Sequence, residues 1–300
     1  MTSFAHGPST IRLGDIEVPR LGFGAMQLPG PMVWGEPKNP DEARAVLRRV
    51  VDLGIKLIDT AWYYGPHVSN RLIAETLHPY AKDLVIVTKL GGKRTPDKGW
   101  AAHNRPEQLR EGCEEDLRSL RLERIDVCNL RWIGHSDVPF GEGLDAMIAL
   151  QKEGKIRHLA ISSVSVAQAR EAIERTPIVG IENLYNVAAG ERRLGKLPHA
   201  AIEGQEELVD LCEKQGIAFL PFFMLSIPGP NNPKSPAVAA IAKKRGVTEA
   251  QVAIAWTLAR SPAMLPIPGT SSRGHLEENW AARTIELAKD EIAAISDARA

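Results

Sequence analysis

Short apolar runs alternate along the chain with longer segments whose apolar positions recur every three or four residues. The runs predict strands, and the longer segments predict helices. We expect strands at residues 21–25, 56–59, 84–89, 125–130, 157–162, 178–183, 217–222 and 264–267. The helices that follow them are expected at 40–53, 70–77, 106–120, 141–152, 166–174, 205–214, 237–244 with 248–259, and 275–282.

Eight strands that are each followed by a helix indicate a parallel sheet, because parallel strands need crossover connections. Eight such units close naturally into an α/β fold of the (β/α)8 TIM barrel type, with extra helices near the C-terminus. The chain of 300 residues fits a single domain, residues 1–300. A doubly wound open sheet is the competing fold, but residues 22–24 lack the third glycine of its usual phosphate-binding turn.

Local patterns refine this expectation at four places. A β-hairpin at residues 11–18 is expected to plug one end of the barrel. A stretch rich in Pro, Asn and Gly at 228–236 is expected to form a mobile loop at the rim. Capping boxes are expected at the starts of two helices: Asn39 with Glu42, and Ser165 with Gln168.

Composition and charge narrow the function classes. Lys and Arg total 37, as do Asp and Glu, so the formal net charge is zero and does not favour nucleic acid or an anionic membrane surface. The three cysteines follow no metal-ligand spacing, so we expect no metal site and a reducing compartment. No apolar run reaches the ~18 residues of a membrane span, and the N-terminus lacks a signal-peptide core. We therefore expect a cytoplasmic protein.

The predicted strand ends carry the candidate chemistry. Asp59 and Lys89 each end a predicted strand, Arg131 follows another, and Tyr64 lies in the loop after Asp59. In a barrel these strand ends meet at one mouth. An ammonium beside a phenol lowers the pKa of the phenol, and a carboxylate beside the ammonium keeps it charged. Taken singly, each residue could be a loop cap, a rim aromatic or a solvated strand end; together they indicate proton donation.

Motifs in the same order along nearly the whole chain resemble the aldo-keto reductases. They are PRLGFG at 19–24, IDTA at 58–61 with YG at 64–65, VTK at 87–89, RIDV at 124–127, the region around Ser162, and IPGTSS at 267–272 with EN at 278–279. The resemblance implies a carbonyl reductase that uses NADPH, with NADH possible. It also implies that Tyr64 is the proton donor, that Lys89 lowers its pKa, and that Asp59 holds the lysine charged.

Arg131 departs from the family pattern, which places a histidine after this strand. A guanidinium does not give up its proton at ordinary pH, so Arg131 would act as a fixed cation beside the reacting oxygen or would bind an anionic group of the substrate. An ion pair with a loop carboxylate at the rim is the third alternative. The Asn-Leu-Arg variant at 129–131 is similar to a bacterial branch of the family that reduces pyridoxal, which implies pyridoxal or a related aromatic aldehyde as substrate.

The resemblance also implies binding residues, including three positions that usually read Ser, Asn and Gln around the nicotinamide carboxamide. The cofactor set is Gly24, Ala25, Met26, Asp59, Ser162, Ser163, Glu182, Phe222, Phe223, Leu225, Ile267, Gly269, Thr270, Ser271, Ser272, His275, Glu278 and Asn279. The substrate set is Met26, Tyr63, Tyr64, Arg131, Trp132 and Phe223.

Two other function classes remain open from the sequence. A nicotinamide-binding redox-sensing or regulatory subunit with weak or no catalysis is one, because the family histidine and part of the carboxamide set are changed. A Schiff-base lyase that uses Lys89 as nucleophile is the other. The expected partner is a small aldehyde or ketone, and the expected state is a monomer or weak oligomer.

Overall fold

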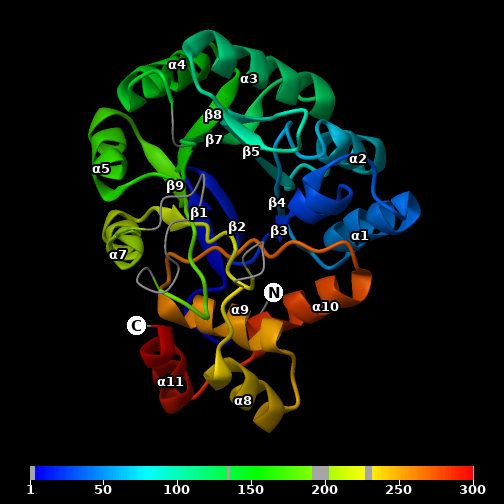
Figure 1. Ribbon diagram of the computed structural model, residues 1–300, viewed down its shortest axis with the longest axis vertical. Coiled ribbons are helices and arrows are strands. Elements are labelled where there is room, and N and C mark those ends of the chain that lie inside the picture. The colour runs from blue at the N-terminus through cyan, green and yellow to red at the C-terminus, as the bar shows by residue number, and fades with distance from the viewer. Residues whose placement is uncertain (1–3, 134–135, 191–202, 227–231, 300) are drawn as a thin grey trace.

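The computed structural model describes residues 4–133, 136–190, 203–226 and 232–299. Its centre is a parallel sheet that curls into a barrel in the order β3, β4, β5, β7, β8, β9, β10 (Figure 1). These strands span Phe23–Gly24, Leu57–Asp59, Val85–Arg94, Ile125–Arg131, Ile156–Ser162, Ile178–Glu182 and Ala218–Phe219. The predicted α/β barrel is confirmed.

The chain at residues 263–269 fills the eighth position of the barrel without forming a regular strand. Parallel bridges join it to both neighbouring strands: Phe219 to Met264, and Gly24 to Gly269. Pro266 and Pro268 have no amide hydrogen to donate to a ladder. Their carbonyls still accept from the amides of Gly22 at 2.9 Å and Gly24 at 3.3 Å on the β3 side. On the β10 side Leu265 donates to Phe219 and Phe219 donates to Ala263, each at 2.8 Å, so the hydrogen bonding is one-sided only toward β3.

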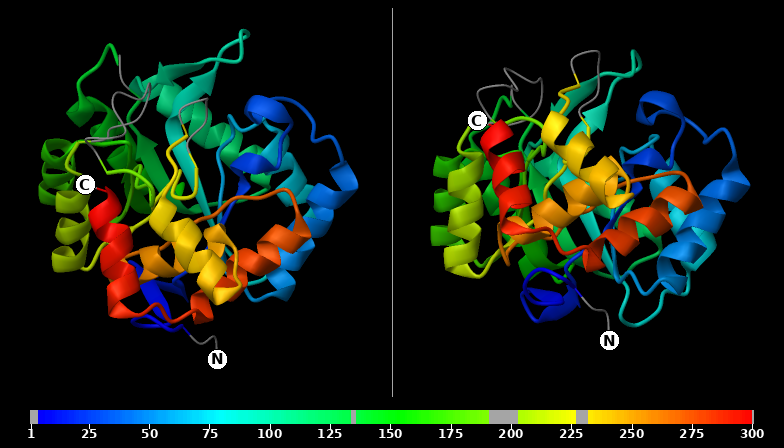
Figure 2. Two further views of the ribbon diagram at one scale, coloured as in Figure 1. Left: turned by 60° about the horizontal axis from the view of Figure 1, so that its bottom comes forward. Right: turned by 90° about the horizontal axis from the view of Figure 1, so that it is seen from below.

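The predicted hairpin is present at the other end of the barrel from the site described below. Strands β1 (Thr10–Leu13) and β2 (Ile16–Pro19) pair antiparallel around a tight turn. Leu13 and Val18 are fully buried and pack with apolar residues from inside the barrel. The hairpin therefore plugs the barrel, as the views with it (dark blue) at the bottom show (Figure 2).

Helices surround the sheet and cover its outer face (Figure 1). They are α1 (Pro40–Asp52), α2 (Val68–Leu77), α3 (Pro106–Leu120), α4 (Phe140–Lys152), α5 (Val166–Arg175), α7 (Gln205–Gln215), α8 (Pro236–Arg245), α9 (Glu249–Arg260), α10 (Arg273–Ala281) and α11 (Lys289–Arg299). Short 3-10 helices occupy Ala25–Gln27, Pro31–Val33 and Ala282–Thr284. None of the described helices is long and apolar enough to cross a membrane.

One of the two predicted capping boxes forms. Ser165 and Gln168 cap each other's backbone amides at the start of α5. At the start of α1 the Asn39 side chain accepts from the amide of Glu42 at 3.0 Å, as expected for an N-cap. The carboxylate of Glu42 does not complete the box, because it accepts instead from Arg273 at the start of α10.

One predicted strand is longer than expected. The strand predicted to end at Lys89 continues to Arg94 and returns as β6 (Trp100–His103), which pairs antiparallel with it. This continuation requires glycine at position 91, because its φ is 104° and the carbonyl of Arg131 leaves no room for a side chain.

The loop predicted at 228–236 is described only in part. Residues 228–231 lie outside the described residues, and Pro236 already belongs to α8.

Candidate active site

An ion pair between Lys89 and Asp59 lies at the floor of the barrel mouth. Asp59 ends β4 and Lys89 lies on the neighbouring β5, so the parallel register brings the two side chains together. The Nζ of Lys89 lies 2.5 Å from each carboxylate oxygen of Asp59 and donates to the carbonyl of Thr60 at 3.2 Å. A second carboxyl, on Glu182 at the end of β9, places Oε1 3.4 Å from the same nitrogen.

All three of these ionisable side chains are buried. Burial disfavours the ammonium of Lys89, but Asp59 and Glu182 outweigh it and raise the pKa of Lys89 well above its usual value. Burial raises the pKa of Asp59 against the pull of Lys89. Burial also raises the pKa of Glu182 to about 8, and the negative charge of Asp59 adds to that effect. Lys89 is therefore a cation, and Asp59, which holds it with both oxygens, is its anionic partner.

Tyr64 stands beside this pair with its ring centroid 5.4 Å from the Nζ of Lys89. Burial raises the pKa of Tyr64 to about 12, although Lys89 acts in the opposite direction. The predicted sign of the lysine's effect is therefore right, but desolvation of the phenolate outweighs it and the net pKa rises. Within the described residues, the Nζ hydrogen bonds go to Asp59 and Thr60 and not to the phenol oxygen.

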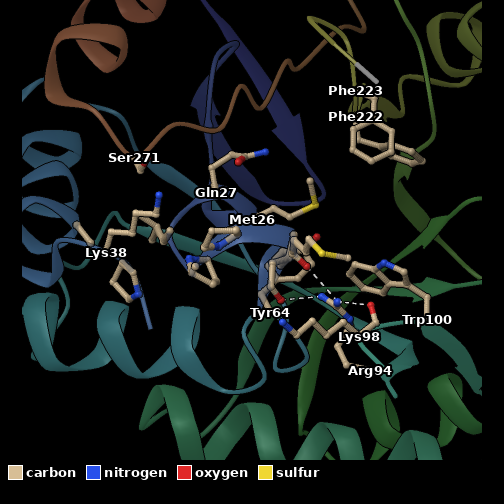
Figure 3. Close-up of a pocket in the computed structure, with 18 of the residues that line it drawn as sticks. Met26, Gln27, Lys38, Tyr64, Arg94, Lys98, Trp100, Phe222, Phe223 and Ser271 are labelled. Atoms are coloured by element: carbon tan, nitrogen blue, oxygen red, sulfur yellow. Dashed lines mark hydrogen bonds between the residues drawn. The ribbon is translucent and has the colours of Figure 1, made fainter. Parts of the chain in front are cut away.

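A cavity of about 730 Å³ opens above this cluster. Tyr64 and Glu182 both line it, so the buried pair lies directly beneath its wall. Phe222 and Trp100 lie toward one end of the cavity and Ser271 lies toward the other (Figure 3). The cavity thus connects the predicted proton donor with the predicted adenosine-phosphate segment.

Arg131 ends β7 and lines the same cavity. Its guanidinium carbon lies 5.4 Å from the ring centroid of Phe222. In the described part of the chain its side chain makes no ion pair or hydrogen bond, and its Nε is buried without a partner. The rim ion pair considered from the sequence is therefore not found there. A cation left unpaired beside a cavity is suited to an anionic group of a ligand.

The predicted substrate wall forms only in part. Met26 and Phe223 line the cavity (Figure 3). Trp132 does not, because its ring packs edge to face on Phe140, with the ring centroids 5.2 Å apart. Gly143 of α4 leaves the space for this packing, since a Cβ there would lie only 3.0 Å from the tryptophan ring.

Tyr63 supports the wall from behind instead of lining it. The side chain is fully buried, and its ring makes edge contacts with the rings of Tyr64 at 5.4 Å and Trp100 at 5.8 Å. Its hydroxyl has no hydrogen-bond partner among the described residues. We expect Tyr63 to fix the positions of the two aromatic rings that do line the cavity.

Sequence reasoning missed the rim that Arg94 builds. Its guanidinium lies over the rings of Trp34 and Trp100, at 5.4 and 4.3 Å from their centroids. It also donates to four backbone carbonyls, those of Met32, Val33, Lys98 and Gly99. Arg94 thereby ties the β5–β6 hairpin to the loop after β3. No local sequence signal points to it, because Trp34 and the carbonyls of Met32 and Val33 lie about 60 positions from Arg94 in the chain.

The residues that the resemblance assigns to a nicotinamide ring gather at the ends of β8 and β9 and after β10. Ser162 pairs in register with Glu182 across these strands. The hydroxyls of Ser162 and Ser163 are buried, and within the described residues neither has a hydrogen-bond partner. Phe222 lines the cavity, whereas Leu225 packs against the apolar core.

Four predicted cofactor residues have a structural role in closing the barrel. A Cβ on Gly24 would lie 2.6 Å from the carbonyl oxygen of Ile267, and a Cβ on Gly269 would lie 2.7 Å from the carbonyl oxygen of Gly24. Both glycines are therefore required by close backbone approach. Ala25 and Ile267 are buried apolar residues, and none of the four lines the cavity.

The remaining predicted residues follow at 270–279. Ser271 lines the cavity (Figure 3). The Thr270 hydroxyl accepts from the amide of Ser272 at 3.1 Å, and Ser272 caps α10. Of the others, His275 and Glu278 are exposed and Asn279 is buried.

Arg273 is the cation that follows directly on this segment, and it is already paired. Its Nε lies 3.1 Å from Oε2 of Glu42 on α1, and its backbone amide donates to Oε1 of Glu42 at 3.2 Å. The guanidinium holds the pKa of Glu42 below its usual value. An anionic ligand at this end of the cavity would therefore compete with Glu42 for Arg273.

Comparisons with known proteins agree with this geometry. The chain is 38% identical over 292 residues to pyridoxine 4-dehydrogenase from Escherichia coli, which covers 96% of this chain and 97% of that protein. The fold matches a glycerol dehydrogenase from Gluconobacter oxydans with a TM-score of 0.78 at 23% identity, covering 97% of this chain and 94% of the other. It also matches an aldo/keto reductase from Klebsiella pneumoniae in complex with NADP and acetate, with a TM-score of 0.73, 24% identity, and coverage of 96% and 94%.

The sequence profile of the aldo/keto reductase family matches residues 20–300. That range includes every strand of the barrel and all the residues of the buried cluster. The chain therefore belongs to the aldo/keto reductase family and is an NAD(P)H-dependent oxidoreductase that reduces carbonyl groups.

Proposed function

We propose that this enzyme reduces an aromatic aldehyde with NADPH, and that its substrate is pyridoxal, which becomes pyridoxine. The observation that carries the proposal is the unpaired guanidinium of Arg131 on the same cavity as Tyr64. A ring that bears an ionised hydroxyl beside its aldehyde offers a carbonyl to Tyr64 and an anion to Arg131 at once. The likeness to pyridoxine 4-dehydrogenase from Escherichia coli supports the same substrate.

The residues around the cavity fit a dinucleotide. The hydroxyls of Ser162 and Ser163 are buried and have no hydrogen-bond partner among the described residues. Neither serine lines the cavity, but both lie next to Glu182, which does. Phe222 would stack on the nicotinamide while these serines hold its carboxamide. Ser271 and the start of α10 would receive the phosphates of the adenosine half, because amide and hydroxyl donors at a helix start suit an anion. NADPH is favoured over NADH by analogy with the Klebsiella pneumoniae relative.

In this proposal the residues of the cluster together control one proton, that of the Tyr64 hydroxyl. NADPH, when bound, supplies a hydride to the carbonyl carbon. Because its pKa is about 12, Tyr64 carries its proton at neutral pH and can give it to the carbonyl oxygen as negative charge develops there. Lys89 then stabilises the phenolate that remains, and Asp59 keeps Lys89 charged and in place.

Arg131 selects the substrate by charge in this scheme. Its guanidinium would pair with the ionised ring hydroxyl and so orient the neighbouring aldehyde toward Tyr64. Phe222 lies under the guanidinium, and Trp100 lines the same end of the cavity, so a flat aromatic ring is favoured there. A fixed cation beside the reacting oxygen is the other role that the sequence left open for Arg131.

The test follows NADPH absorbance with three aldehydes: pyridoxal, pyridoxal with its ring hydroxyl methylated, and benzaldehyde. We expect Arg131→Met to lower kcat/KM for pyridoxal by about 10- to 100-fold, the size of a lost charged hydrogen bond of about 1.5–3 kcal/mol. The same variant should leave the methylated aldehyde and benzaldehyde within about threefold of the parent. Arg131→Lys, which keeps the charge, is the matched control and should recover part of the loss.

Three outcomes would count against the proposal. Full pyridoxal turnover by Arg131→His, with no gain on benzaldehyde, would remove the role of Arg131. Equal loss on all three aldehydes in Arg131→Met would assign it to the reacting oxygen instead. Undiminished turnover by Tyr64→Phe would remove the proton donor itself. NADH run beside NADPH decides the cofactor preference.

A further inference from the structure

Glu182 is a buried carboxyl to which the mechanism above gives no part in proton transfer. It is 1% exposed and lines the cavity beside Tyr64. Its Oε2 accepts a hydrogen bond from the side-chain amide of Asn129 at 3.0 Å, and its Oε1 lies 3.4 Å from the Nζ of Lys89. These two contacts hold the carboxyl at the floor of the cavity, next to the ion pair with Asp59.

Three other oxygen atoms lie closer to the N–H donors of Lys89 than Glu182 does. An ammonium has three hydrogens, and the three acceptors within 3.2 Å of Nζ are the two carboxylate oxygens of Asp59 and the carbonyl of Thr60. Oε1 of Glu182, at 3.4 Å, is farther from Nζ than these three acceptors and is therefore the weakest competitor for a lysine proton. Two neighbouring buried carboxyls beside one ammonium do not both ionise readily, so one of them keeps a proton. The geometry makes Glu182 that one.

Charged and titratable groups face Glu182 from several elements. Asp59 reaches it from β4, Lys89 from β5 and Arg131 from β7, while Tyr63 and Tyr64 approach from the loop after β4. Lys89 and Asp59 balance each other. Ionisation of Glu182 would therefore add one negative charge that only Arg131 offsets within this cluster of described residues.

We propose that Glu182 is a positioning residue that stays protonated while the enzyme works, and that loss of this proton at alkaline pH weakens proton donation by Tyr64. The proposal rests on the proposed role of Tyr64. A neutral Glu182 leaves the charge of Lys89 shared between Asp59 and Tyr64. An ionised Glu182 draws on the same charge and raises the pKa of Tyr64 further, so the phenol becomes a poorer acid.

The sign and the pH window follow from the burial of the carboxyl. Burial raises the pKa of Glu182 to about 8, so the carboxyl is neutral below that pH and ionised above it. The reduction should therefore slow as pH rises through about 8. Tyr64 itself, with a pKa of about 12, would not produce a change in this range.

The test compares pH profiles of kcat/KM for benzaldehyde, a substrate that does not titrate. Between pH 7 and pH 9 the parent should fall by up to about tenfold, whereas Glu182→Gln should stay level because glutamine cannot ionise. Asp116→Asn is the matched control: burial raises the pKa of Asp116 to about 7, but this residue of α3 does not line the cavity. Asp116→Asn should therefore keep the alkaline fall of the parent.

Infrared titration of the free protein tests the proton without turnover. The measurement uses an Asp116→Asn background, because Asp116 is another buried carboxyl whose pKa is raised to about 7. In that background the carbonyl stretch of a protonated carboxyl should disappear near pH 8, and it should be missing from pH 6 upward when Glu182→Gln is added, with both proteins folded by circular dichroism. An Asp116→Asn protein without this band at pH 6, or an alkaline fall kept by Glu182→Gln, would overturn the proposal. If Tyr64→Phe kept its turnover, the proposed function would fail, and the band would still decide where the proton lies.

Discussion

Replacing Lys89 by methionine removes the charge beside Tyr64 with little change in the shape of the side chain. The Nζ lies 5.4 Å from the ring centroid of Tyr64. With an effective dielectric constant of about 20, two unit charges at that separation interact by about 3 kcal/mol. That energy corresponds to roughly two pKa units. The pKa of Tyr64, about 12 in the parent, should rise further in Lys89→Met.

The assay is steady-state reduction of pyridoxal at pH 7. Loss of about 3 kcal/mol from the developing phenolate predicts a decrease in kcat/KM of about 100-fold. Cofactor affinity, followed by quenching of protein fluorescence, should change much less, because Lys89 is buried beneath the cavity wall and does not line the cavity.

In this experiment a loss of folding stability must be distinguished from a loss of catalytic activity. Removing one partner of a buried ion pair costs about 3–5 kcal/mol, because the other is left without its counter-charge. The double variant Lys89→Met with Asp59→Asn removes both charges and should unfold at a higher temperature than Lys89→Met alone. If the double variant is folded and loses less than tenfold in kcat/KM, the charge of Lys89 does not stabilise the developing phenolate of Tyr64.

Further predictions address the rim, the barrel closure and the C-terminal helix. Arg94→Met removes the hydrogen bonds to four carbonyls and should lower the Tm by at least about 4 °C and raise KM more than it lowers kcat. Gly24→Ala places a Cβ 2.6 Å from the carbonyl oxygen of Ile267 and should cost about 1–3 kcal/mol in urea unfolding. Hydrogen bonding from Arg245 lowers the pKa of Glu291 to about 2, so this pair stabilises the fold above about pH 4.5 and loses its effect as pH falls toward 2. The stability difference between the parent and Glu291→Gln should shrink over that interval.

The barrel could be predicted from the sequence because its strands are short, apolar and separated by helices. The same pattern could not show that residues 264–267 pair without a regular ladder. Strand propensity reflects apolar side chains, whereas the missing ladder reflects the lack of an amide hydrogen on Pro266 and Pro268. The position of this segment was therefore predictable, but its hydrogen bonding was not.

Contacts between distant loops were beyond sequence reasoning for a different reason. Arg94 meets carbonyls near residue 33 and stacks on Trp34, which is about 60 positions away in the chain. No local period encodes such a contact. The expectation that Trp132 lines the cavity did not take such contacts into account. The direction of its side chain is decided by the space over Gly143 and not by its place at a strand end.

The pKa of Tyr64 could be predicted from the sequence only in part. Residue types and strand ends were enough to place an ammonium near the phenol and to give the sign of its effect. They did not give burial, which is the largest influence on Tyr64 and acts in the opposite direction. The depth of a side chain is a property of the whole barrel, so the net pKa required the structure.

The roles proposed for Glu182 and Arg131 make a joint prediction. With Glu182 neutral, Lys89 is balanced by Asp59, and Arg131 remains the uncompensated cation among the described residues of this cluster. Ionisation of Glu182 would cancel that charge, so the cavity should bind an anionic substrate less well and Tyr64 should donate its proton less well. For pyridoxal, KM should then rise and kcat fall over the same pH interval. For benzaldehyde, kcat alone should fall. A KM for both aldehydes that stays level across pH 8 would mean that the two charges are independent.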